Sequence, residues 1–458
     1  MTGRPPRITP VVTVTEGIAA IRAQEHLAAG FPPDVLADAE RAAARQPDPS
    51  TPRIDLPFVT IDPPGSRDLD QAMHLERRGD GHRVTYAIAD VCAFVVPGGP
   101  IDREAHARAV TTYLPDERVP LHPPQLSEGA ASLLPGEDRP ACVWTLDLDA
   151  TGAVTAATVQ RAVVRSTAQL DYAHVPDELR ALLQEIGDRR LALERARGGV
   201  SLRLAEQEVH HGPDGWAVAY RVPLATEDWN AQISLMTGMA AAQLMLRGGI
   251  GLLRTQPAPE PKALARLRTA AAALGAPWPQ SQGYPEWIRT LDPAVPAHAA
   301  LLHQAAGSGH GAGYTAFDGT APQDAGHFAI AASYAHVTAP LRRLADRYAL
   351  EICLALCAGA EVPAHVRAAL PELPAQMAAG TQRAGRAERA VIDLVEATVL
   401  ADRVGERFDA VAIDDDLVQL RDPAVRTRVD GPPLVIGAAL SVRLEAVDVT
   451  ARTVRFAV

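Results

Sequence analysis

The chain has 458 residues and a formal net charge of −11, with 47% hydrophobic and 22% charged side chains. This composition excludes disorder of the whole chain, and the length allows two or three domains. The acidic balance argues against a passive, nonspecific coat on nucleic acid, which would be basic. It leaves room for an enzyme that guides a polynucleotide through a local channel lined by arginine.

The sequence has neither a membrane span nor a secretory signal. No apolar run reaches the length of a membrane span, and residues 1–7 are not followed by the apolar core of a signal peptide. The four cysteines show no paired metal-ligand spacing, and Cys353 and Cys357 lie four residues apart in an apparently helical run. We expect both to be small buried side chains in a reducing compartment. The sequence therefore predicts a cytoplasmic protein with no membrane partner.

The first 50 residues predict a small helical region. Two Ala-rich helices are expected over 16–28 and 33–44, because a Gly-Phe-Pro-Pro stretch at 30–33 separates them. A Pro-rich linker follows at 46–52. We interpret residues 1–50 either as a helix-turn-helix element or as a helical lid packed on the rest of the protein.

From residue 51 the pattern indicates strands followed by helices. Residues 84–90 and 141–149 alternate with the period of a strand, and residues 153–166 complete a hairpin after the second of these. Helical patterns follow at 177–197, 227–248, 260–274, 295–306, 340–358 and 376–403. We therefore predict an α+β fold, with a mixed α/β domain over residues 51–400 whose sheet carries an acidic loop.

Residues 401–458 have a different pattern, in which short alternating strands are separated by turns. The strands are expected at 405–413, 417–420, 434–437, 440–448 and 453–458. This succession predicts a β-barrel of the OB type, a fold that binds single strands through a groove with stacking aromatics. Phe408 and Phe456 are the only aromatic residues in this segment, and we expect both to lie in the barrel core.

The acidic loop, residues 60–72, sets three carboxylates around a Pro-Pro-Gly turn that no regular helix or strand interior tolerates. Asp68 and Asp70 are two residues apart, so they share a face of an extended segment, and the turn can fold Asp62 back toward them. Three converging carboxylates suit a hard divalent cation such as Mg²⁺. An Asx-rich surface turn is the alternative explanation for so short a pattern.

Three segments in order resemble the signatures of the ribonuclease II and ribonuclease R family of exoribonucleases. They are residues 62–72, residues 87–91 together with 112–115, and residues 326–328 together with 334–346. The resemblance spans residues 52–400. It implies a monomeric, metal-dependent enzyme that degrades single-stranded RNA from the 3′ end to nucleoside 5′-monophosphates. It also implies that the tail barrel is an RNA-binding OB fold and that helices replace the family's N-terminal cold-shock modules.

The resemblance also implies the metal ligands. Asp62, Asp68 and Asp70 would be catalytic and would hold Mg²⁺, with Mn²⁺ as the alternative ion. Gln71 stands where the family normally has a fourth carboxylate, and its neutral amide is a weaker candidate ligand. Asp90, at the end of a predicted strand, either compensates for this change or stabilises a turn. The departure at Gln71 motivates an alternative function, a catalytically impaired RNA-binding protein derived from such a nuclease.

Two residues match family positions that face the substrate. Arg342 matches the arginine at the scissile phosphate, where it would stabilise charge in the transition state; its alternative role is an ion pair with Asp346 on the same helix. Tyr113 matches a tyrosine that packs against the 3′-terminal nucleotide, and a half-buried core tyrosine is the alternative. Both matches favour a polymer over a third hypothesis, a phosphohydrolase of small nucleotides.

Weaker substrate candidates come from the same segments and from two other helices. Each has a structural alternative: an ion pair, a packed imidazole, a helix cap or a solvated helical face. The candidates are Arg343, His336, Thr338, Arg386, Glu388 and, with an ambiguous alignment that also includes Glu227, Asn230.

Overall fold

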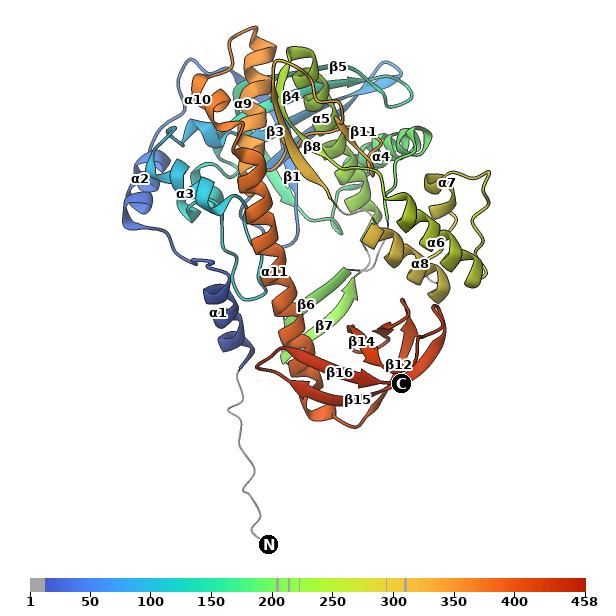
Figure 1. The fold of residues 1–458 in the computed structure, drawn as a ribbon. Helices are drawn as coiled ribbons and strands as arrows, with labels where there is room; N and C mark the ends of the chain where they lie inside the picture. The colour runs from blue at the N-terminus through green and yellow to red at the C-terminus, as the bar shows by residue number, and fades with distance from the viewer. Residues whose placement is uncertain (1–12, 203–205, 213–214, 222, 294, 309–310) are drawn as a thin grey trace.

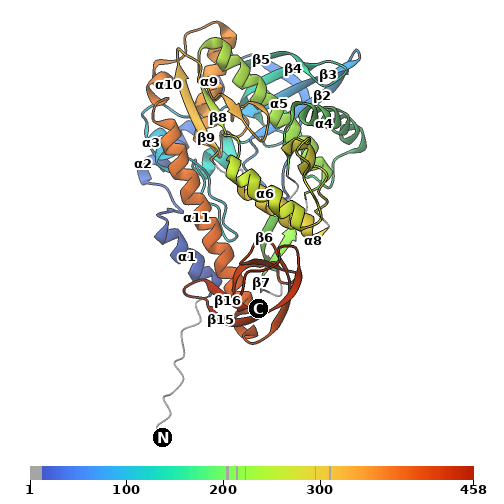
Figure 2. The ribbon, with the colours of Figure 1, turned by 45° about the vertical axis from the view of Figure 1, so that its right-hand side comes forward.

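The protein has a larger lobe built around one β-barrel and a smaller lobe built around a second (Figure 1). The computed structural model describes residues 13–458, apart from 203–205, 213–214, 222, 294 and 309–310. The helix α11 (Leu373–Leu400) runs from the larger lobe to the smaller one, and Figure 2 shows the same relationship after rotation. None of the described helices combines the length and the apolarity that a membrane crossing requires.

The barrel of the larger lobe carries the acidic loop. Its five strands are β1 (Arg53–Ile61), β2 (Gln71–Arg78), β3 (Gly81–Ala89), β4 (Asp138–Leu148) and β5 (Val154–Leu170). β2 to β5 are antiparallel neighbours, and β1 closes the barrel by pairing antiparallel with β2 and parallel with β5. The acidic loop is therefore the connection between β1 and β2, and the predicted hairpin of β4 and β5 is confirmed.

Packing inside and around this barrel requires both large and minimal side chains. Tyr86 and Trp144 are fully buried opposite each other on β3 and β4. At Gly81 a Cβ would lie 1.9 Å from the carbonyl oxygen of Leu148, so only glycine fits the start of β3. The α+β fold predicted from the sequence is confirmed.

Helices cover the barrel and supply the other walls of the site. They include α3 (Pro100–Arg108), α4 (Asp177–Arg197), α5 (Ala225–Gly248), α6 (Pro261–Ala273), α7 (Tyr284–Ile288), α8 (Pro296–Ser308), α9 (Leu344–Ala358) and α10 (Ala364–Ala369). The prediction over 177–197 is correct at both ends, because Pro176 precedes the helix and Gly198 ends it in the left-handed conformation (φ 85°). The predicted helices at 227–248, 260–274, 295–306 and 376–403 are each found within a few residues.

The predicted helix over 340–358, with Thr338 as its cap, is wrong at its start. The helix α9 begins at Leu344. The preceding segment is held by a distant partner, because the backbone N–H of Leu341 donates to the carboxylate of Asp70 at 2.8 Å. This long-range hydrogen bond, which no local pattern encodes, keeps the segment out of the helix and brings it to the acidic loop.

Short two-stranded sheets, which the sequence did not predict, connect the helices. They are β6 (Glu206–Gly212) with β7 (Gly215–Arg221), β8 (Ile250–Thr255) with β9 (Gly313–Asp318), and β10 (Gly326–His327) with β11 (Ala332–Ser333). β7 packs on α11, and β8 packs on α5 and α9.

The two N-terminal helices pack on different parts of the protein. α1 (Val14–Gln24) lies along α11, where Gly17 faces Leu394, and α2 (Pro33–Ala43) packs against α3. The two helices thus pack on different elements, and both interpretations of this region stay predictions. Residues 1–12 of the predicted N-terminal region, with the start of the chain, lie outside the described residues.

The smaller lobe is the predicted tail barrel. Its strands are β12 (Arg407–Ala412), β13 (Leu417–Leu420), β14 (Arg426–Asp430), β15 (Ala439–Asp448) and β16 (Thr453–Ala457), closed in the order β12-β13-β14-β16-β15. The expected strand at 434–437 is wrong: the third strand is β14, because its alternation of Arg, Thr and Val pairs with β13. Phe408 and Phe456 are buried and meet edge to face in the core, as predicted.

Candidate active site

A polar cavity of about 570 Å³ lies where the acidic loop, α5 and the segment before α9 meet. Its walls combine carboxylates, arginines, aromatic rings and small neutral polar groups, which is the lining expected for a charged substrate rather than an apolar one. The lining residues are Ile61, Asp62, Pro63, Ser66, Asp68, Asp70, Gln71, Tyr113, Tyr172, Glu227, Asp228, Asn230, Ala231, Ser234, Leu235, Tyr334, Thr338, Arg342 and Arg343.

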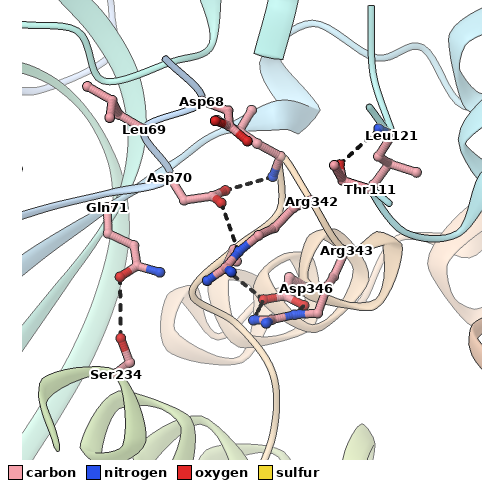
Figure 3. A network of polar contacts seen from close by, with 12 residues as sticks. Asp68, Leu69, Asp70, Gln71, Thr111, Leu121, Ser234, Arg342, Arg343 and Asp346 are labelled. Atoms are coloured by element: carbon pink, nitrogen blue, oxygen red, sulfur yellow. Dashed lines mark hydrogen bonds and ion pairs between the residues drawn. The ribbon is translucent and has the colours of Figure 1, made fainter. Parts of the chain in front are cut away.

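Asp70 is the most buried carboxylate of the cavity, with 4% of its surface exposed. One oxygen accepts the backbone N–H of Leu341, and the other lies 3.4 Å from Nε of Arg342 (Figure 3). Burial raises the pKa of Asp70 to about 8, although Arg342 acts in the opposite direction. Without a further cation this carboxylate would hold a proton near neutral pH.

Asp62 follows the last residue of β1 and lines the same cavity. Burial raises its pKa to about 6, and the Asp68 charge adds to that effect against the pull of Arg342. Its Oδ2 is buried and has no hydrogen-bond partner among the described residues. A buried carboxylate oxygen without a partner is costly, and a bound cation would satisfy it.

Asp68 differs from the other two because two side chains donate hydrogen bonds to it. The Tyr113 hydroxyl donates to its Oδ2 at 3.2 Å, and Nη1 of Arg118 donates to its Oδ1. Arg118 also lies 3.3 Å from the carboxylate of Glu128. The charge of Asp68 is thus balanced by an arginine that the sequence did not single out.

The three aspartates line one cavity, but they are not drawn tightly together. Among the described residues, they are not part of a group whose metal-ligating atoms all lie within 4.8 Å of one another. The contacts of Asp70 with Leu341 and of Asp68 with Arg118 hold these carboxylates apart. The donor set is nevertheless all oxygen, which fits a hard ion such as Mg²⁺.

Gln71, the neutral residue at the fourth position, is engaged by neighbours. Its Oε1 accepts hydrogen bonds from the hydroxyls of Tyr86 and Ser234, the latter at 3.3 Å. Figure 3 shows the side chain of Gln71 reaching toward Ser234 on α5. The oxygen that could coordinate a metal therefore already accepts hydrogen bonds from two hydroxyl groups.

The two consecutive arginines have separate tasks. Arg342 points to Asp70, whereas Arg343 forms two hydrogen bonds of 2.7 and 2.8 Å to Asp346 (Figure 3). The alternative in which Arg342 pairs with Asp346 is therefore not what the structure has. Burial is the largest single influence on the pKa of Arg343 and lowers it. The charge of Asp346 and its hydrogen bonds to Arg343 act in the opposite direction, and the pKa is raised on balance.

Several substrate candidates lie in the cavity wall. Tyr113 is 45% exposed, so its ring is open to a ligand. Thr338 and Asn230 are mostly buried, and Oδ1 of Asn230 has no hydrogen-bond partner among the described residues. Glu227 also lines the cavity and pairs with Arg221.

Other candidates are not brought into the cavity wall. His336 is half-buried and its Nδ1 lies 2.6 Å from the Tyr314 hydroxyl, which matches its packed alternative. Arg386 and Glu388 are on α11, where Arg386 pairs with Glu25 of the segment after α1. Asp90 is buried and binds Arg161 instead of compensating for Gln71.

Cavity residues missed by the sequence analysis include Tyr172, Ser234 and Tyr334. Tyr172 follows β5 by two residues, so its position at a strand end was the only signal that could have marked it. Ser234 sits on α5 among similar small residues and carries no local signal.

The protein thus has two barrels connected by the long helix α11, and a carboxylate-lined cavity lies beside the first of them. Family models match both parts: the RNB domain over residues 53–357 and the RNase II-type exonuclease C-terminal S1 domain over residues 406–458. The chain therefore belongs to the RNB domain family. Enzymes of this family depend on metal ions.

Comparison with individual proteins agrees. The chain is 28% identical over 396 residues to ribonuclease R of Escherichia coli, covering 78% of this chain and 48% of that protein. It thus spans about half the length of this curated relative. A structure of Mycoplasma genitalium ribonuclease R with single-stranded RNA matches 97% of this chain and 78% of its own, with a TM-score of 0.86 and 18% identity. The yeast pseudonuclease Ssd1 matches with a TM-score of 0.72 at 16% identity, so this fold occurs with and without nuclease activity.

Proposed function

We propose that this protein is a metal-dependent exoribonuclease that removes nucleotides hydrolytically from the 3′ end of single-stranded RNA. Water attacks the last phosphodiester, the bond from phosphorus to the 3′ oxygen of the preceding nucleotide breaks, and a nucleoside 5′-monophosphate leaves. The observation that carries the proposal is the cavity in which Asp62, Asp70 and Arg342 surround one polar space.

The side chains of the cavity suit the parts of such a substrate. Arg342 offers a guanidinium to the scissile phosphate, where added negative charge develops. The exposed ring of Tyr113 can stack on any base, so binding would be independent of sequence. The hydroxyl of the half-buried Tyr172 and the amide of the buried Asn230 supply neutral hydrogen-bonding groups beside the charged ones.

Mg²⁺, or Mn²⁺ in its place, would be held by Asp62, Asp68 and Asp70. When bound, such an ion lowers the pKa of a coordinated water and neutralises phosphate charge. The unpartnered Oδ2 of Asp62 favours a cation at this place, and at Asp70 the ion would replace the proton that the raised pKa otherwise retains. Arg118 would have to share Asp68 with that ion.

Incubation of the purified chain with 5′-labelled single-stranded RNA and Mg²⁺ or Mn²⁺ tests the proposal. A descending ladder that EDTA abolishes is expected, and release of 5′-monophosphates is checked by chromatography. Asp70→Asn should remove the ladder and leave RNA binding in place. A 3′-phosphorylated product, or full activity of Asp70→Asn, would contradict it.

A catalytically impaired RNA-binding protein is the second candidate, favoured by one observation: Gln71 replaces a carboxylate and its oxygen is already engaged. This candidate predicts an intact RNA band under all metal conditions, together with saturable binding of the same RNA. The ladder assay separates the two candidates directly.

The proposal includes a monomeric enzyme in the cytoplasm. The free cysteines among the described residues suit a reducing compartment. Light scattering on the purified chain should give the mass of one chain, 48.6 kDa. A stable dimer would contradict this part of the proposal without affecting the chemistry.

A further inference from the structure

A second polar cavity, of about 270 Å³, lies apart from the one that holds the three aspartates and shares no lining residue with it. It is enclosed by the segment after β3, by β5 and by the helices α3, α9 and α10. Ionisable groups predominate in its wall, although it lies between a barrel and its covering helices. The lining residues are Cys92, Val95, Pro97, Asp102, Arg161, Arg347, Tyr348, Glu351, His365 and Val366.

Two potential metal ligands, Cys92 and Glu351, line this cavity, and a third, Asp90, lies beside them. Asp90 directly follows β3, Cys92 lies in the 3₁₀ turn Val91–Ala93, and Glu351 lies on α9. One ligand atom from each of the three side chains lies within 4.8 Å of the other two. The carboxylates of Asp90 and Glu351 are buried. Zn²⁺ accepts both thiolate sulfur and carboxylate oxygen as ligands, whereas Mg²⁺ prefers oxygen alone.

Arg161 already contacts this cluster, in a way that leaves coordination open. Its Nε donates to Oδ2 of Asp90 at 2.7 Å, and its Nη2 donates to Oε1 of Glu351. It thus engages one oxygen of each carboxylate. Hydrogen bonds of this kind orient metal-ligating carboxylates in known sites, so Arg161 can act as an outer partner of a bound ion.

Arg347 provides an independent sign of a missing partner. This residue is 5% exposed, and its Nη2 is used by Asp102 and the Tyr348 hydroxyl. Its Nη1 is buried without a hydrogen-bond partner among the described residues, and the side chain lines the cavity. A buried guanidinium donor without an acceptor is costly. A thiolate at Cys92 would add an acceptor to this cavity.

The charges around the cavity leave room for a divalent cation. The carboxylates of Asp90, Asp102 and Glu351 outnumber the guanidiniums of Arg161 and Arg347 by one. Ionisation of the thiol would bring the surplus to two negative charges. A divalent ion would then make the cluster neutral, which favours its burial.

We propose that Asp90, Cys92 and Glu351 bind a divalent ion of the zinc class, separate from the oxygen-ligated ion of the active site. Binding releases the thiol proton to solvent as the metal–sulfur bond forms.

The location indicates a structural role for this ion. Next to Asp90, the backbone N–H of Ala89 donates to the carbonyl of Asp70 at 2.9 Å. Glu351 lies on α9, the helix that begins directly after Arg343. The metal would therefore tie together the two elements that place the acidic loop and the cavity arginines.

Cobalt spectroscopy on the full chain tests this site. After removal of metals with EDTA, one equivalent of Co²⁺ should produce a sulfur-to-cobalt charge-transfer band. Cys92→Ser should abolish the band, and Cys357→Ser, the matched control, should retain it. Asp68→Asn should also retain it, because the active-site ligands contain no sulfur. Absence of the band in the wild-type protein, or its survival in Cys92→Ser, would overturn the proposal.

A measurement without substitutions covers the case in which Cys92→Ser does not fold. Zn²⁺ should slow alkylation of Cys92 by iodoacetamide at least tenfold in the wild-type protein, because a metal-bound thiolate is protected. Peptide mass spectrometry follows the reaction, and a tenfold change corresponds to about 1.4 kcal/mol. Alkylation of Cys357 should not change. Equal rates at Cys92 with and without Zn²⁺ would refute the metal site.

Discussion

Arg342 faces Asp70 across the cavity, with Nε 3.4 Å from Oδ2, and the contact is an ion pair without a hydrogen bond. Its neighbour Arg343 is instead committed to Asp346, which is completely buried. Consecutive residues of one segment thus divide into an arginine available to a substrate and an arginine that holds the segment. The separation is possible because α9 begins only after both of them.

Replacement of Arg342 should therefore affect catalysis, and replacement of Arg343 should affect stability. Arg342→Ala should lower kcat by about 10²–10³-fold, the usual effect of removing one group that stabilises transition-state charge, with little change in stability. Arg343→Ala should lower the free energy of unfolding by about 3 kcal/mol, because it leaves Asp346 as a buried charge without its partner. Single-turnover RNA cleavage and urea denaturation measure the two effects. Equal loss of stability in both variants would contradict this division.

The stability of the metal-free protein should depend on pH in the direction that the raised pKa of Asp70 dictates. Burial raises this pKa from 3.8 to about 8, so the folded chain holds a proton that the unfolded chain has lost between these values. Its free energy of unfolding should therefore fall as pH rises from 5 to about 8. Mg²⁺ requires the ionised carboxylate, so it should stabilise the protein more at pH 8 than at pH 6.

Thermal melting in EDTA and in Mg²⁺ across this pH range measures the effect. Asp70→Asn is the control, since it removes the titrating group while keeping the shape of the side chain. The wild-type protein should lose more stability than this variant between pH 5 and 8 in EDTA. An equal loss of stability in the two proteins would show that Asp70 titrates in its ordinary range.

The sequence could predict those parts of the cavity whose residues are close together in the chain. Asp68 and Asp70 lie in one loop, and the position of that loop between two strands follows from the alternation around it. The contact of Arg118 with Asp68 joins residues 50 positions apart, and no local pattern encodes it. The ion pair of Arg386 with Glu25 likewise depends on how α1 packs on α11, which no local pattern encodes.

Tyr113 should bind the end of the RNA through its ring rather than through its hydroxyl. Tyr113 is 45% exposed and lines the cavity, whereas its hydroxyl donates a hydrogen bond to Asp68. In an Asp70→Asn background, Tyr113→Ala should weaken RNA binding by about 1–3 kcal/mol, the usual value of one base stacked on an aromatic side chain. Tyr113→Phe should bind almost normally. Fluorescence anisotropy with labelled RNA makes the comparison, and equal weakening in both variants would assign the effect to the hydroxyl.

Gln71 is the position at which a single change should alter the metal site most informatively. Its Oε1 accepts hydrogen bonds from Tyr86 and Ser234, and a carboxylate can accept the same two bonds. Gln71→Glu should therefore fold normally while adding a negative charge beside Asp70. We expect Mn²⁺ to bind several-fold more tightly, because each opposite charge within a few ångströms contributes about 1 kcal/mol even in a polar environment.

Calorimetric titration of Mn²⁺ into the wild-type protein and Gln71→Glu measures this change without recourse to activity. Gln71→Ala is the matched control: it removes both hydrogen bonds and should leave Mn²⁺ affinity unchanged if the amide oxygen is not a ligand. A large loss of affinity in Gln71→Ala would mean that the amide coordinates the ion after rotating away from Tyr86 and Ser234. Unchanged affinity in Gln71→Glu would mean that this position does not face the metal at all.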